Sequence, residues 1–131
     1  MDSGKVRSFE GLIAWQKARA FTKEIYLATR RAAFARDAAL TWQMQRAAVS
    51  VMSNIAEGFE RGGRAEFHKF LVIAKGSAGE LLAQLIVARD VGHINDADYK
   101  RLRRDAEEVG RVIGGLRASV ARQRDRDNEK D

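Results

Sequence analysis

The sequence predicts an all-α protein, folded as an antiparallel up-down four-helix bundle that forms an oligomer. Three observations predict this fold. Four segments repeat apolar residues in steps of three and four, the spacing that places them on one side of a helix. No segment shows the sustained alternation of apolar and polar residues that indicates a strand. The chain contains no Pro, a residue that costs about 3 kcal/mol inside a helix.

The four apolar stripes run from Ala14 to Ala32, from Leu40 to Ile55, from Phe67 to Ala88 and from Tyr99 to Val120. The connections between them are short, so sequential helices should be antiparallel neighbours. The length of 131 residues fits one domain with a real core.

Glycine residues and capping residues also indicate the helix boundaries. The first helix should fade near residues 33–36. Gly63 is expected to be the N-cap of the third helix, with Glu66 in its first turn. Gly92 should end that helix, and Asn95 should cap the fourth.

These limits divide the chain into an N-terminal arm at 1–10, the bundle at 11–121 and a tail at 122–131. The tail alternates charge signs and contains no apolar residue. We therefore expect it to be frayed or disordered.

The second and third helices each carry a second apolar line, opposite the core stripe. A helix that is apolar on both sides is normally buried on both sides, and a four-helix monomer buries only one. The pattern favours an oligomer over a monomer with scattered surface hydrophobics, which are individually normal. The residues expected at the oligomer interface are Trp42, Val49, Met52, Val72, Gly76, Gly79, Ala83 and Ile86.

A narrow polar strip lies between the two apolar lines of the second helix. Its members are Arg46, Ser50, Ser53 and Glu57, with Asn54 at its edge. Hydrogen bonding across a helix or subunit interface is the favoured interpretation, because a buried Arg46–Glu57 pair would need such partners. A ligand groove is the alternative.

The positive charge is concentrated near the start of the chain. The formal net charge is +6, and residues 1–36 hold eight basic and three acidic residues. Arg outnumbers Lys, and Arg suits bidentate phosphate contacts. The candidate nucleic-acid-binding residues are Arg19, Lys23, Arg30, Arg31 and Arg36.

No catalytic set is visible in the sequence. There is no Cys, which excludes thiolate catalysis and Cys-ligated metals. His68 and His93 have the surroundings of ordinary surface histidines. We expect no enzyme activity, no metal and no cofactor. No apolar run approaches the roughly 20 residues that span a bilayer, and the N-terminus lacks a signal-peptide layout, so a cytoplasmic protein without membrane contact is expected.

A series of short motifs runs along the chain between Leu12 and Ile94. They are Ala14–Ala18 (AWQKA), Ile25–Tyr26, Gln45–Ser50 (QRAAVS), Asn54–Gly58 (NIAEG), Glu66–Phe67, Phe70–Leu71, Ala74–Ser77 (AKGS) and Glu80–Leu81. Through these motifs the chain resembles a known family of bacterial four-helix-bundle proteins. Some members are encoded in intervening sequences of large-subunit ribosomal RNA genes. Two positions depart from the family pattern: Phe34-Ala35 stands where Phe-Pro is usual, and Gly63 where a Ser N-cap is usual.

The resemblance implies a ring-shaped homopentamer with a basic surface. It also implies a fold similar to the accessory variability determinant of diversity-generating retroelements, which binds reverse transcriptase and nucleic acid. The expected function is a non-enzymatic oligomer that binds RNA or DNA through backbone phosphates, as an accessory to RNA processing or reverse transcription. The alternative is a protein-binding adaptor or structural ring with an acidic protein partner.

Overall fold

The computed structural model describes residues 5–130 and contains only helices and turns over that range. A short 3-10 helix, η1 (Phe9–Gly11), precedes α1 (Ile13–Thr29) and a single helical turn, α2 (Ala32–Ala35). Three longer helices follow: α3 (Ala38–Glu60), α4 (Arg64–Asp90) and α5 (Asp96–Lys130). The predicted all-helical fold with four long helices is confirmed.

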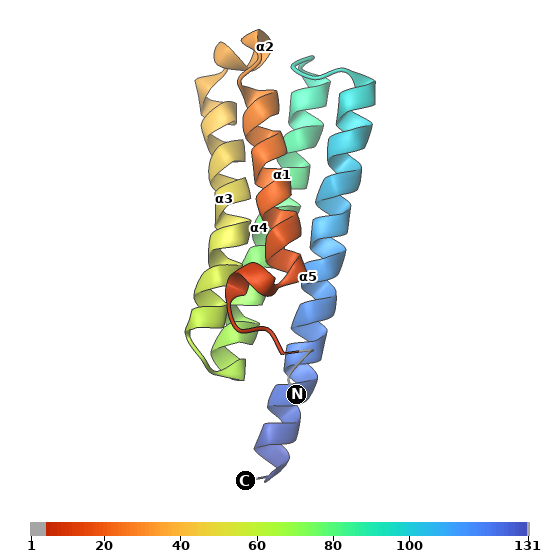
Figure 1. The fold of residues 1–131 in the computed structure, drawn as a ribbon. Helices are drawn as coiled ribbons and strands as arrows, with labels where there is room; N and C mark the ends of the chain where they lie inside the picture. Colours follow the sequence, from red (N-terminus) through yellow and green to blue (C-terminus); the bar gives the residue numbers. More distant parts are fainter. Residues whose placement is uncertain (1–4, 131) are drawn as a thin grey trace.

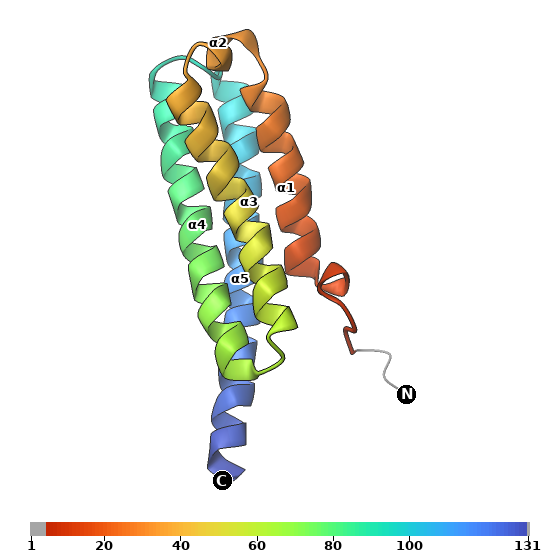
Figure 2. The same cartoon turned by 90° about the vertical axis from the view of Figure 1, so that its left-hand side faces the viewer.

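The four long helices lie side by side, and the connections alternate between the two ends of the bundle (Figure 1). α2 and the α4–α5 turn lie at one end, while the α3–α4 turn lies at the other. α1 packs against α3 and α5, and α4 packs against the same two helices. The α3–α4 and α1–α5 sides of the bundle are therefore opposite each other (Figure 2).

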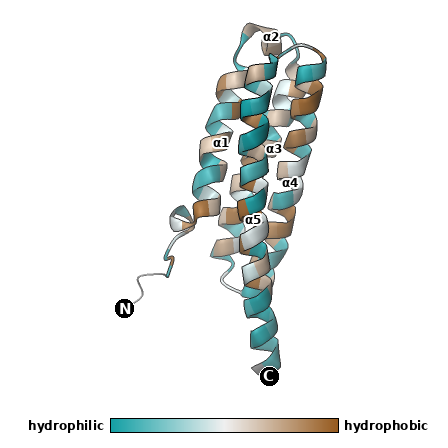
Figure 3. Ribbon diagram, turned by 90° about the vertical axis from the view of Figure 1, so that its right-hand side faces the viewer, coloured by the Kyte–Doolittle hydropathy of each residue, from teal (hydrophilic) through white to brown (hydrophobic). Residues whose placement is uncertain are grey.

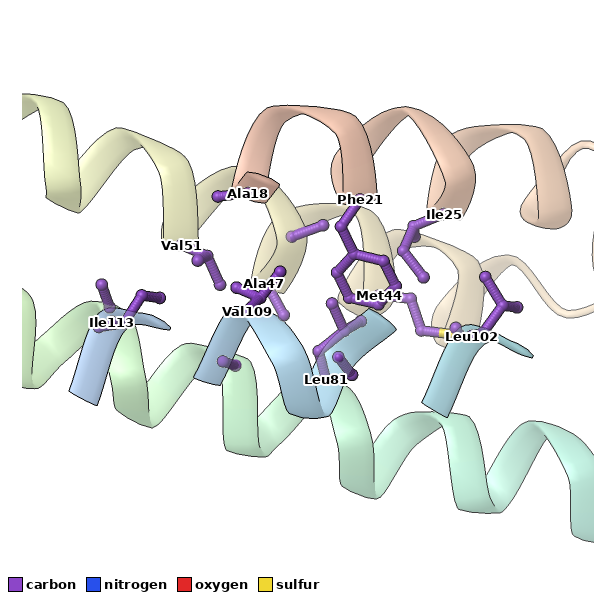
Figure 4. Close-up of a cluster of buried hydrophobic side chains, with 14 of the residues drawn as sticks. Ala18, Phe21, Ile25, Met44, Ala47, Val51, Leu81, Leu102, Val109 and Ile113 are labelled. Atoms are coloured by element: carbon purple, nitrogen blue, oxygen red, sulfur yellow. The ribbon is translucent and has the colours of Figure 1, made fainter. Parts of the chain in front are cut away.

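The core is made of the four predicted stripes, except that Ala32 is exposed. α1 ends at Thr29, before the predicted limit near residues 33–36, and Ala32 begins the separate turn α2. Phe21 and Ile25 of α1, Met44 of α3, Leu81 of α4 and Leu102 of α5 point into one cluster (Figure 4). Ile25, Met44, Leu81 and Leu102 have no exposed surface. Such burial contributes roughly 1.5–3 kcal/mol for each large side chain.

The helix ends follow the predicted caps. Gly63 occupies the N-cap of α4 in an extended conformation, and the Asn95 side chain accepts the Asp98 amide at the start of α5. Gly92 has a φ of +82° after the end of α4. The His93 amide donates to the Ala88 carbonyl and the Gly92 amide to the Arg89 carbonyl, which together form a Schellman motif. A glycine is favoured there because other residues rarely adopt positive φ.

The C-terminal tail differs from its prediction. Residues 122–130 continue α5 instead of forming a disordered segment, and the helix extends beyond the α3–α4 turn (Figure 1). Arg64, the first residue of α4, forms an ion pair with Asp127 in this extension. Elongating an existing helix is inexpensive compared with nucleating one, so the extension needs no apolar residue of its own.

The described part of the N-terminal arm is docked on the bundle. Val6 and Phe9 pack against the core, and the Phe9 and Trp15 rings meet edge to face at a centroid distance of 5.0 Å. The Gln16 side chain donates to the Glu10 carbonyl at 2.8 Å. Residues 1–4 of the predicted arm lie outside the described residues.

Candidate nucleic-acid interface

The outer side of α1 carries three of the predicted phosphate-binding residues. Arg19, Lys23 and Arg30 recur along the helix and are all exposed, on the side opposite its buried residues. The Arg19 guanidinium lies 5.6 Å from the centroid of the Trp15 ring, a cation–π distance. We call these three residues the basic face. Arg36 is also exposed and caps the end of α2.

Arg31 does not belong to this group, because it is engaged by an acid of α5. Its Nη1 atom lies 2.5 Å from Asp98 Oδ2, and this contact lowers the pKa of the Asp98 carboxyl. Nothing in the sequence pattern pointed to this pair, whose members are separated by 67 positions.

Arg31 is the N-cap of α2, and two other ion pairs join α1 itself to α5. Lys17 Nζ lies 2.7 Å from Glu108 Oε1, and Arg101 Nη1 lies 2.8 Å from Glu24 Oε1. The Lys17 contact lowers the pKa of Glu108. α5 therefore neutralises part of the positive charge that the sequence places on the first 36 residues. With the Arg31–Asp98 pair, these contacts define what we call the α1–α5 interface.

A cavity of about 400 Å³ opens at this interface. Its floor is apolar, with Phe21 and Val109, and Lys23 and Asp105 are among the charged residues around it. Both signs of charge line the cavity, so it does not present a purely basic surface to an anion. The basic face, on the outer side of α1, is better placed for phosphate contacts.

The predicted oligomer-interface residues divide by exposure. Trp42 is 59% exposed, Val49 38% and Val72 47%, and Gly76, Gly79 and Ala83 are also exposed. Met52 and Ile86 are half-buried and pack against the core of their own chain. Ile73 and Val87 are exposed as well, which the sequence prediction missed.

α4 is unusually apolar for a helix with so much exposed surface. An 18-residue window has a mean hydropathy of 1.6, yet only 33% of that window is buried. By length and composition alone, α4 is the one helix among the described residues that could cross a membrane. The last turns of α5, by contrast, are strongly hydrophilic (Figure 3).

The polar strip of α3 is used mainly inside the chain. Ser50 Oγ and Ser77 Oγ of α4 are 2.9 Å apart, and Asn54 Nδ2 donates to the Ser50 carbonyl and hydroxyl. Glu57 pairs with Arg61 one turn away at 2.8 Å, so no Arg46–Glu57 pair forms. The favoured interpretation, hydrogen bonding across a helix interface, holds for Ser50, whereas the hydrogen bonds of Asn54 stay within α3.

Gly58, the last residue of the Asn54–Gly58 motif, lies where α3 and α4 approach each other. A Cβ atom at this position would lie 2.7 Å from the Phe70 Cβ and 3.1 Å from the Phe67 ring. Only a residue without a side chain allows α3 to approach α4 this closely. The Asn54–Gly58 motif is thus a packing device between the two helices.

The histidines lie at opposite ends of the bundle. His93 Nε2 lies 2.9 Å from Asp37 Oδ2, and this contact lowers the pKa of Asp37, the N-cap of α3. The pKa of His68 is lowered by burial and by the nearby charges of Arg124 and Arg117. Within residues 5–130 no group of three His, Cys, Asp or Glu side chains is placed to hold a metal.

Comparison with known proteins places this arrangement in a family. Residues 10–115 match the model of the 23S rRNA-intervening sequence protein. The chain belongs to that family. Residues 116–130, which include the protruding end of α5, lie beyond the match.

A solved structure supports the fold. A protein of unknown function from the S23 ribosomal protein family of Bacteroides thetaiotaomicron superposes with a TM-score of 0.75. The two chains share 21% identity, and the alignment covers 81% of this chain and 96% of the other. No curated protein matches this intervening-sequence family member.

Proposed function

We propose that the protein is a non-enzymatic, cytoplasmic homo-oligomer that binds nucleic acid through backbone phosphates. The observation that carries the proposal is the separation of two surfaces. Arg19, Lys23 and Arg30 are exposed on α1, with no ion-pair partner among the described residues. Val72, Gly76, Ala83 and Val87 follow one line on α4, interrupted by the single charge of Glu80, on the helix diagonally opposite α1.

The assembly surface of the proposal comprises the outer sides of α3 and α4. Val49, Val72, Ile73 and Val87 are each more than a third exposed, and burying them against another copy removes apolar area from water. A closed ring, with five subunits as the family resemblance implies, would display the basic face once per subunit. Several weak phosphate contacts then act together through multivalency.

The phosphate contacts predict a salt-dependent affinity with little sequence preference. Arg19, Lys23, Arg30 and Arg36 are the proposed contacts. Arg31 is a weaker candidate because phosphate must compete with the carboxylate of Asp98. The family resemblance implies that some members are encoded in intervening sequences of ribosomal RNA genes, so RNA processing is one proposed setting. The second proposed setting is an accessory role to a reverse transcriptase.

The test is a triple replacement of Arg19, Lys23 and Arg30 by Glu. We expect loss of binding to RNA and DNA at low salt, measured by fluorescence anisotropy, with helicity preserved. Replacement of Lys100, Arg104 and Arg111, which are exposed on α5, by Glu is the charge-matched control. Unchanged affinity of the α1 variant would contradict the proposal. Capture of an acidic protein that survives nuclease treatment would favour an adaptor role instead.

Assembly is tested separately. Light scattering should give a mass several times the 14.6 kDa of one chain. Val49→Glu or Ala83→Glu should dissociate the oligomer while circular dichroism stays helical. A wild-type mass equal to one chain would rule out the oligomer.

A further inference from the structure

A second concave region lies between α3 and α4. It has a volume of about 520 Å³ and is lined by Trp42, Gln43, Arg46, Ala47, Ser50 and Glu80. Most of these residues are polar. We refer to this region as the Trp42 pocket.

Trp42 and Arg46 form a pair at one wall of this pocket. They are one helical turn apart, and the Arg46 guanidinium carbon lies 5.2 Å from the centroid of the indole ring. The Trp42 side chain remains 59% exposed, although Trp usually buries most of its large surface. The pair therefore presents an aromatic surface and a positive charge side by side.

The charges of the pocket argue against a dry contact with another protein copy. Neither Arg46 nor Glu80 forms an ion pair with any described residue, and both are exposed. Covering them with an apolar surface would desolvate two unpaired charges, which is strongly unfavourable. Val72, Gly76 and Ala83 of α4 carry no charge themselves, but Glu80 lies between Gly76 and Ala83 on the same side of the helix, so an assembly through this side must leave Glu80 in contact with water.

The surroundings of the pocket favour an anionic ligand. Trp42 lies in the second turn of α3, and the connection before this helix carries Arg30 and Arg36. Figure 2 shows this connection, which includes α2, at the end of the bundle where α3 begins. Two of the acids at this end, Asp37 and Asp98, are already engaged. Asp37 accepts the Leu40 amide and contacts His93, and Asp98 is paired with Arg31. The exposed arginines are thus free to meet phosphates.

We propose that the Trp42 pocket binds an unpaired base of a single-stranded nucleic acid. The base stacks on the Trp42 indole, while Arg46 and the arginines of the preceding connection contact the flanking phosphates. The Gln43 amide and the Glu80 carboxylate are the groups available to the base edge, because the Ser50 hydroxyl already bonds to Ser77 and Asn54. This inference rests on the proposed nucleic-acid function, and it removes Trp42 from the assembly surface.

Base stacking makes a prediction that phosphate binding alone does not. Trp42→Ala should weaken binding to an oligouridylate of about ten nucleotides by about 5- to 150-fold, the range for one lost stacking contact. Trp42→Phe retains an aromatic face and should lose much less. Affinity for heparin, a polyanion without bases, should be the same for all three proteins.

Fluorescence gives an independent measurement. Trp15 is only 8% exposed, so a base stacked on Trp42 should quench the more exposed of the two tryptophans. A Trp15→Phe variant isolates the Trp42 signal. Quenching by oligouridylate but not by heparin supports the proposal, and equal quenching by both overturns it.

The outcomes separate this inference from the function on which it rests. If the wild-type protein binds neither polyanion, both proposals fail together. If it binds both, and Trp42→Ala leaves the oligouridylate affinity unchanged, only the base pocket is wrong. If Trp42→Ala lowers the mass measured by light scattering without selectively weakening oligouridylate, Trp42 is an assembly contact and the inference is overturned. Circular dichroism of the Trp42→Phe variant controls for folding.

Discussion

The two opposite sides of the bundle are built by different physical means. At the α3–α4 interface, Gly58 lets the helices approach closely and Ser50 bonds to Ser77. At the α1–α5 interface there are three ion pairs, and members of two of them line a cavity of about 400 Å³. One interface depends on the absence of a side chain, and the other depends on charges that water and salt also reach.

The two kinds of contact should contribute differently to the stability of the fold. Close packing is sensitive to volume changes of a single methylene and indifferent to ionic strength. Exposed ion pairs are screened by salt and add little stability. We therefore expect substitutions at the α3–α4 interface to change folding, and those at the α1–α5 interface to change mainly its dependence on solution conditions.

The largest effect should come from Gly58→Val. The new Cβ would meet the Phe70 Cβ and the Phe67 ring, neither of which is a flexible chain end. Overpacking of this kind costs about 1–3 kcal/mol, measurable as a lower midpoint of urea unfolding. Gly110→Ala on α5 is the control, because nothing lies within 4 Å of its added Cβ. That variant should be stabilised by up to about 1 kcal/mol. Equal stability of the two variants would show that the close approach at Gly58 is not required.

A smaller effect is expected for Ser77→Ala. This change removes the partner of the Ser50 hydroxyl, while Asn54 still donates to it. The loss should be about 0.5–1.5 kcal/mol in the free energy of unfolding. Ser53→Ala on the exposed side of α3 is the matched control and should fall within about 0.5 kcal/mol of the wild type. A loss as large for Ser53 as for Ser77 would contradict the assignment.

The sequence predicted those features that depend on neighbouring residues. The apolar stripes, the Gly63 and Asn95 caps and the Gly92 terminus are local, so periodicity and cap chemistry suffice. Contacts between distant positions were not predictable: Arg31 and Asp98 are 67 positions apart, and Asp37 and His93 are 56 apart. Their pairing follows only from which helices become neighbours.

Two errors have the same origin. The tail was expected to be disordered because it has no apolar residue, yet helix α5 continues into it and Arg64 of α4 meets Asp127. Arg31 was expected to be available to phosphate, although Asp98 of α5 engages it. Composition counts charges, whereas the fold decides which of them face an opposite charge.

The α1–α5 interface should respond weakly to mutation and strongly to salt. The Lys17 and Glu108 side chains are 41% and 42% exposed, so a double-mutant cycle with Lys17→Met and Glu108→Gln should give a small coupling energy. The coupling should disappear near 1 M salt, where the screening length falls to about 3 Å. The effect of Ser77→Ala should be the same at low and high salt. A coupling that persists at high salt would place the ion pair in the same class as the buried α3–α4 contacts.

Acid should act on the same pairs. The partners Arg31 and Lys17 lower the pKa of Asp98 and Glu108 below their ordinary values of 3.8 and 4.5. A lowered carboxyl pKa in the folded state contributes stability above the unfolded pKa, and this contribution is lost as the pH falls through the folded pKa. The difference in free energy of unfolding between the wild type and Glu108→Gln should therefore be constant above about pH 4.5. It should shrink as the pH falls below that value.

The pKa of His68 is also lowered, from its ordinary value of 6.5, so its protonation disfavours the folded state. Stability is lost as the pH falls below 6.5, which lies well above the carboxyl range. His68→Gln should reduce the pH dependence of the free energy of unfolding only just below pH 6.5. Glu108→Gln should reduce it only in the acidic range where carboxyl groups titrate. Urea unfolding of both variants across this pH range measures the two effects separately. Because His68 lies on α4 and Glu108 on α5 facing α1, a single transition shared by both variants would show that the two sides of the bundle are not independent.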